Sequence, residues 1–126
     1  MPDQHAKSYL QSKPDAWLDH PFGPDVGVYK IRGKMFATFG YDGEVARINL
    51  KCDPEEAMAL RDIFESVIPG YHMNKAHWNT VILDGSIPAG EIERMIDRSY
   101  GLVVRGLKKP ERIALEIRHG SESLYK

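Results

Sequence analysis

Residues 67–83 read VIPGYHMNKAHWNTVIL. Between a Pro-Gly break and a short β-like run, this segment holds two histidines, a lysine, a tryptophan, a tyrosine and two asparagines. Core and loop sequences rarely place so many side chains with specific bonding ability in one stretch. The segment is therefore the first candidate for a recognition surface.

Composition describes an ordinary globular chain. Its 126 residues are 42% hydrophobic and 28% charged, which is enough for one core without disulfides or metal. The net charge of −1 means that any attraction to phosphate must come from a local patch. Cys52 is the only cysteine, which excludes an intramolecular disulfide and a cysteine-rich zinc site. Without a signal-peptide run or a membrane-length apolar stretch, we expect a soluble, cytoplasmic monomer.

Three strands are predicted by alternation at residues 26–31, 35–41 and 45–51. Asp42-Gly43 predicts a type I′ turn between the last two, because glycine adopts positive φ without steric cost. Pairing Tyr41 with Glu44, and a three-residue loop at residues 32–34, then separates an apolar face from a mixed, basic face. The apolar face comprises Tyr29, Ile31, Met35, Ala37, Phe39, Ala46, Ile48 and Leu50, and the opposite face comprises Val28, Lys30, Phe36, Thr38, Arg47, Asn49 and Lys51.

Helix signals surround these strands. Pro14 ends a first helix, Asp53-Pro54 is a capped start for a second, and Pro88 begins a third. Trp17 and Tyr100 are expected in the core. The order α-β-β-β-α-β-α-α predicts one α+β domain over residues 1–126, a two-layer sandwich whose antiparallel sheet has helices on one face. The helices are predicted at residues 3–13, 53–67, 88–107 and 110–118, with a further strand at 79–83 and a loose tail from about residue 119.

Several motifs follow one another along the chain: PFG at 21–23, GKMFA at 33–37, NLKCDP at 49–54, PGYHMNKAHWNTV at 69–81, LDG at 83–85 and SYGLVV at 99–104. In these motifs and their order the sequence resembles the MmcQ/YjbR family of small bacterial domains. The resemblance implies a secretion-chaperone-like α+β fold. It also implies the family's label of a DNA-binding domain of double-wing type, in which β-hairpins flank the nucleic acid.

A modest basic patch is predicted on the three-stranded region. The patch has a net charge of +3, from Lys30, Arg32, Lys34, Arg47 and Lys51 set against Asp42 and Glu44. Such residues also keep exposed sheets soluble and discourage edge pairing. As a binding surface, the patch would contact phosphates of DNA. The predicted phosphate contacts are Lys30, Arg32, Lys34, Arg47 and Lys51, with Lys75 from the motif at 69–81.

The recognition surface itself is predicted from His72, Asn74, His77 and Trp78, where a planar base would stack on indole beside Lys75. Two readings stay open for this segment. In the second, Trp78 is core and the polar side chains only satisfy loop backbone, as buried polar groups must. The histidines are five residues apart, so they do not share a helix face as metal ligands four apart would, and we expect no metal.

The sequence contains no recognisable catalytic motif. The chain has no GxSxG, P-loop or GxGxxG sequence, so we expect no catalysis and no cofactor. Cys52 ends an apolar alternation and is expected to be a buried small hydrophobe, although its place before a helix start is the one argument for a reactive thiol. The leading hypothesis is a DNA-binding or regulatory domain. The alternative is a protein-interaction or small-ligand module that uses Phe36 and Trp78 on the same face as apolar anchors.

Overall fold

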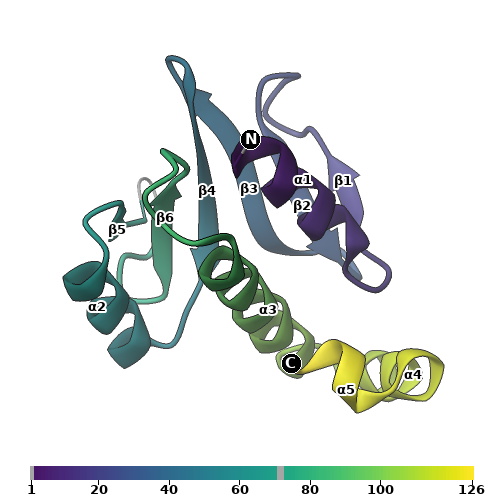
Figure 1. The fold of residues 1–126 in the computed structure, drawn as a ribbon. Coiled ribbons are helices and arrows are strands. Elements are labelled where there is room, and N and C mark those ends of the chain that lie inside the picture. The colour runs from purple at the N-terminus through teal and green to yellow at the C-terminus, as the bar shows by residue number, and fades with distance from the viewer. Residues whose placement is uncertain (1, 71–72) are drawn as a thin grey trace.

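The computed structural model describes residues 2–70 and 73–126, and its centre is one antiparallel sheet of six strands in the order β1-β2-β3-β4-β6-β5. Helices α1 and α3 lie across one face of this sheet, and α2 packs beside β5 (Figure 1). The predicted α+β sandwich is confirmed. The strands are β1 (Trp17–Asp19), β2 (Gly27–Ile31), β3 (Lys34–Asp42), β4 (Val45–Lys51), β5 (Val67–Pro69) and β6 (Trp78–Ile82); the helices are α1 (Pro2–Ser12), α2 (Pro54–Ile63), α3 (Ala89–Arg105), α4 (Lys109–His119) and α5 (Ser121–Leu124).

The β3–β4 hairpin has the predicted faces from Ala37 onward but another register. Asp42 pairs with Val45 and Phe39 pairs with Ile48, so Gly43 and Glu44 form the two-residue turn. Gly43 has a φ of 66° at the first turn position, which is where a type II′ turn requires glycine. The predicted pairing of Tyr41 with Glu44 is therefore wrong by two residues. A shift of two keeps side chains on their faces, so Ala37, Phe39, Ala46, Ile48 and Leu50 are buried as predicted. Met35, predicted on the apolar face, is instead half-buried and pairs with Lys30.

The β2–β3 hairpin departs further from the prediction. Its turn is the two residues Arg32-Gly33, not a three-residue loop, because Ile31 pairs directly with Lys34. A β-bulge then leaves Phe36 between the pairs Tyr29–Ala37 and Lys30–Met35. A bulge adds one residue and turns the local side chains. Phe36, expected on the basic face, is instead fully buried in the core.

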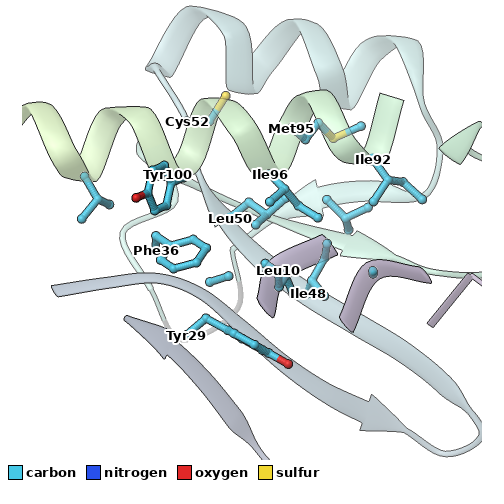
Figure 2. Close-up of a cluster of buried hydrophobic side chains, with 14 of the residues drawn as sticks. Leu10, Tyr29, Phe36, Ile48, Leu50, Cys52, Ile92, Met95, Ile96 and Tyr100 are labelled. Atoms are coloured by element: carbon cyan, nitrogen blue, oxygen red, sulfur yellow. The ribbon is translucent and has the colours of Figure 1, made fainter. Parts of the chain in front are cut away.

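The core lies between the sheet and the helices. Figure 2 shows Leu10 of α1 beside Ile48 of β4, with Ile92 and Ile96 of α3 in the same cluster. Phe36 and Tyr100 meet edge to face with ring centroids 5.2 Å apart, a favoured aromatic geometry. Tyr100 is buried as predicted, and every helix contributes at least one residue to this same core. None of the helices in the described part of the chain has both the length and the apolar character to cross a bilayer.

Ser99 joins α3 to the sheet where the β3–β4 ladder stops. The last ladder pair is Ala37 with Leu50, so Phe36 and Lys51 would pair next. The fully buried Ser99 hydroxyl occupies that step: Oγ donates to the Phe36 carbonyl at 2.5 Å and accepts from the Lys51 amide at 2.8 Å. The hydroxyl thus satisfies two backbone groups that lie beyond the end of the ladder.

Several short elements were not predicted. The edge strands β1 and β5 have three residues each, and β5 replaces the expected last turn of α2, which ends at Ile63. Trp17, expected in the core, lies on β1 with 70% of its surface exposed. The tail expected to be loose instead forms α5, and Leu124 is fully buried against the core. A single buried leucine in a polar segment carries too little periodicity to predict this.

Removing the Ser99 hydroxyl should destabilise the fold. Ser99→Ala leaves the Phe36 carbonyl and the Lys51 amide without a partner, and we expect a loss of roughly 1–3 kcal/mol in the free energy of unfolding, measured by urea denaturation. Ser8→Ala, at an exposed position of α1, is the matched control and should change stability by less than about 0.5 kcal/mol. Equal stability of the two variants would contradict a structural role for the Ser99 bridge.

Candidate functional site

Among the described residues, the sheet face opposite the helices has no helical layer over it (Figure 1). All buried helix residues belong to the core on the other side of the sheet. We call the uncovered side the open face. Lys51 lies on it, because the neighbouring Leu50 and Cys52 point into the core. Its outward-facing residues include Trp17, Lys30, Thr38, Arg47, Asn49, Lys51, Trp78 and Thr80.

Antiparallel pairing brings most of the predicted cations to one end of this face. Trp17 pairs with Lys30, and Lys51 pairs with Trp78. The β2–β3 turn and the loop before β6 lie at the same end. We call this region the basic end of the sheet. It gathers Lys30, Arg32, Lys34, Lys51 and Lys75, whereas Arg47 pairs with Gly40 and Ile82 further along the strands.

Ion pairs divide these cations into two groups. Lys30 Nζ lies 3.0 Å from Asp19 Oδ2, and an Arg47 guanidinium nitrogen lies 2.8 Å from Asp42 Oδ2. The Lys30 contact is the first cause of a lowered pKa at Asp19. In the described part of the chain, the other four cations have no acidic partner within 4.0 Å. These four are Arg32, Lys34, Lys51 and Lys75.

The motif at residues 73–78 is held to α2 by Arg61, which sequence reasoning missed. Arg61 Nε donates to Asn79 Oδ1 at 2.7 Å, and its Nη2 donates to the carbonyl of Lys75. Asn79, 2% exposed, also donates from Nδ2 to the Ala57 carbonyl at 3.3 Å. A polar clamp between α2 and β6 therefore fixes the loop. One arginine in a helix of ordinary composition gives no sequence signal for such a contact.

The four predicted recognition residues differ in their settings. Asn74 serves the loop: its Oδ1 accepts from the Ala76 amide at 3.0 Å and its carbonyl accepts from Trp78 N at 2.9 Å. His77 uses its backbone, since its carbonyl accepts from Cys52 N at 2.7 Å, while its side chain is exposed. Trp78 is half-buried on the open face. His72 lies outside the described residues.

A chain of polar side chains crosses the middle of the open face. Asn49 Nδ2 donates to Thr38 Oγ1 at 2.8 Å, and Thr80 Oγ1 donates to Asn49 Oδ1 at 2.5 Å. The chain links β3, β4 and β6 through side chains as well as through the ladder. These three residues and Arg47 also line a groove of about 990 Å³, whose lining extends through the loop between β1 and β2 to Lys7 and Gln11 of α1.

Cys52 behaves as a buried apolar residue. It is 6% exposed, as predicted, and burial raises the pKa of its thiol to about 11. A thiol with such a pKa is protonated at neutral pH, so it is a weak nucleophile. Among residues 2–70 and 73–126, no three His, Cys, Asp or Glu side chains come close enough together to hold a metal ion.

Comparison with known proteins identifies the family. The YjbR family model matches residues 11–102. The chain belongs to the YjbR family. It is 40% identical to the protein YbdF of Escherichia coli O157:H7 over 104 residues, which cover 82% of this chain and 85% of YbdF. It is 39% identical to YjbR of Escherichia coli K12 over 83 residues, covering 66% of this chain and 70% of YjbR.

Solved structures of similar proteins share the fold of this YjbR-family chain. The crystal structure of Deinococcus radiodurans DR2400, described as a DUF419 domain, superposes with a TM-score of 0.83 at 34% identity, covering 91% of this chain and 90% of DR2400. The crystal structure of a Pseudomonas syringae protein superposes with a TM-score of 0.70 at 36% identity, covering 81% of this chain and 98% of that one.

The contacts of this YjbR-family loop separate its structural residues from its exposed ones. Asn79→Ala should lower the free energy of unfolding by roughly 1–3 kcal/mol, because Arg61 Nε and the Ala57 carbonyl lose a buried partner. His77→Ala should change it by less than about 0.5 kcal/mol, because only an exposed ring is removed. Thermal and urea melts of the two variants check this. A strongly destabilised His77→Ala protein would show that the ring itself holds the loop.

Proposed function

We propose that this domain binds nucleic acid through the basic end of its open face, without catalysing a reaction itself. The main support is that Arg32, Lys34, Lys51 and Lys75 lie at one end of the face. None of them takes part in the ion pairs Lys30–Asp19 and Arg47–Asp42. The chain as a whole has a net charge of −1, so attraction for phosphate must come from a local excess such as this one. The Cys52 thiol is buried and protonated, so it is a poor nucleophile, which is consistent with a binding role.

The two hairpin tips differ in charge, and only one of them is basic. The β2–β3 turn carries Arg32, with Lys34 directly after it, so this tip would contact phosphates in a double-wing arrangement. The β3–β4 turn carries Glu44, with Asp42 directly before it, and lies at the other end of the strands. Arg47 is closer to this acidic tip, and Asp42 offsets its charge. Phosphate contacts are therefore expected from the β2–β3 hairpin and the loop before β6.

A second candidate is a small-ligand-binding module. It is supported by the groove of about 990 Å³, where the polar chain of Thr38, Asn49 and Thr80 meets apolar loop residues. Ligand pockets combine apolar walls with a few placed polar groups in this way. Salt separates the two functions, because phosphate contacts release counterions and an uncharged ligand in a groove does not.

Binding of a fluorescein-labelled oligonucleotide, followed by anisotropy from low to physiological salt, tests the proposal. Affinity should fall steeply with salt, and Lys34→Ala with Lys75→Ala should weaken binding and reduce the logarithmic salt slope by roughly two. Both lysines are exposed, so the fold should be unaffected.

The matched control removes two exposed lysines elsewhere, Lys108→Ala with Lys109→Ala, at the start of α4. It changes the net charge by the same amount and should leave the affinity nearly unchanged. Equal losses in the two double variants would mean that only overall charge matters. Absence of binding at low salt would contradict the nucleic-acid proposal.

A further inference from the structure

Trp17 is the most unusual side chain of the basic end. An indole is large and mostly apolar, yet 70% of Trp17 is exposed on the edge strand β1. It lines a hollow of about 560 Å³ together with Asp15, Asp19, Lys30, Arg32, Gly33 and Arg118. Lys30 pairs with Asp19 at 3.0 Å and Arg118 of α4 pairs with Asp15 at 3.4 Å, so Arg32 is the one cation of this lining outside the ion pairs of the described residues. An aromatic wall beside an unpaired cation suits a ligand that is both planar and anionic.

The backbone around the hollow is also unusual. In the described part of the chain, two non-glycine residues have positive φ, Asp15 at 56° and Arg32 at 51°, and both line this hollow. Arg32 and Gly33 occupy the two central positions of a tight hairpin turn, and both have positive φ, as a type I′ turn requires. Asn-Gly is the favoured sequence there. An arginine in this conformation is less stable than asparagine would be, and such local strain gathers at functional sites.

We propose that the hollow at Trp17 binds an unpaired base, so that the nucleic acid recognised by the open face is single-stranded. The base stacks on the Trp17 indole, and the adjacent phosphate contacts Arg32. This inference rests on the proposed nucleic-acid function and names its substrate class. A duplex hides the faces of its bases inside the helical stack, so an exposed indole has nothing to stack on there, whereas single strands offer every base face.

The strand register supplies a path for the rest of the chain. Trp17 pairs with Lys30 and Lys30 with Met35, while Lys51 pairs with Trp78 on the far side of the β3–β4 ladder. The two tryptophans are thus separated by four inter-strand steps, roughly 19 Å. A single strand that crosses the β-strands from Trp17 meets Lys51 before it reaches the half-buried Trp78. Aromatic groups that alternate with cations are the usual arrangement of single-strand binding surfaces.

The experiment compares an oligothymidylate of about ten nucleotides, which does not self-pair, with a hairpin duplex of similar length by anisotropy at low salt. We expect the single strand to bind at least about five-fold more tightly, and Trp17→Ala to weaken its binding on the order of ten-fold. Trp17→Phe should restore most of the affinity, because phenylalanine still offers a ring. Phe22→Ala is the matched control: this ring is 75% exposed in the loop after β1, and its loss should leave the affinity unchanged.

Arg32→Asn separates function from folding at the turn. Asparagine suits the positive φ, so the variant should melt at an equal or higher temperature while its affinity for the single strand falls roughly three-fold or more. A lower melting temperature with unchanged affinity would overturn the role given to Arg32.

The outcomes also distinguish this inference from the function on which it rests. Binding of the duplex with equal or greater affinity, unaffected by Trp17→Ala, would overturn the single-strand inference and leave the nucleic-acid function in place. Failure of both oligonucleotides to bind would overturn the two together.

Discussion

The Ser99 hydroxyl is the contact on which the two-layer arrangement depends. It stands in the β3–β4 ladder between the Phe36 carbonyl and the Lys51 amide, and so fixes α3 against the sheet. Phe36 is the bulged residue and packs against Tyr100, and the hydroxyl satisfies its carbonyl together with the Lys51 amide. The Lys51 amide donates to Ser99 on the core side, and the Lys51 side chain lies on the open face. One buried serine therefore connects core packing with the placement of a central cation.

The sequence predicted face assignments better than register or element ends. Alternation in β3 and β4 placed Phe39 and Ile48 correctly even though the turn was displaced by two residues, because the period of a strand is two. Phe36 was misplaced since a bulge breaks that period without a local signal. Trp17 was misplaced because residue type alone favours burial, and only tertiary structure shows that β1 is an exposed edge. Leu124 is the opposite error: its polar surroundings in the sequence favour an exposed tail, but the tertiary structure buries it against the core.

The site was predictable in its charges and not in its geometry. Five of the six proposed phosphate contacts come together at one end of the sheet because antiparallel strands return to the same edge, which follows from the hairpin order. The ion pair of Asp19 with Lys30 and the hydrogen bond of Arg61 to Asn79 join side chains that are far apart in the sequence. Spacing along the chain therefore does not predict them. At residues 73–79 the hydrogen bonds match the reading in which polar side chains hold the loop, and recognition stays a prediction. Asn74 and Asn79 hold the loop, and Trp78 and His77 face outward.

Mapping the contact surface by two-dimensional ¹H–¹⁵N NMR during titration with the oligothymidylate tests the central claim most directly, that the open face binds and the helical layer supports it. The indole N–H signals of Trp17 and Trp78 and the amides of Lys30 and Lys51 should shift together, while those of α2 stay in place. Shifts confined to the helical side, with both indole signals unchanged in the presence of bound oligonucleotide, would contradict the assignment of the open face as the binding surface.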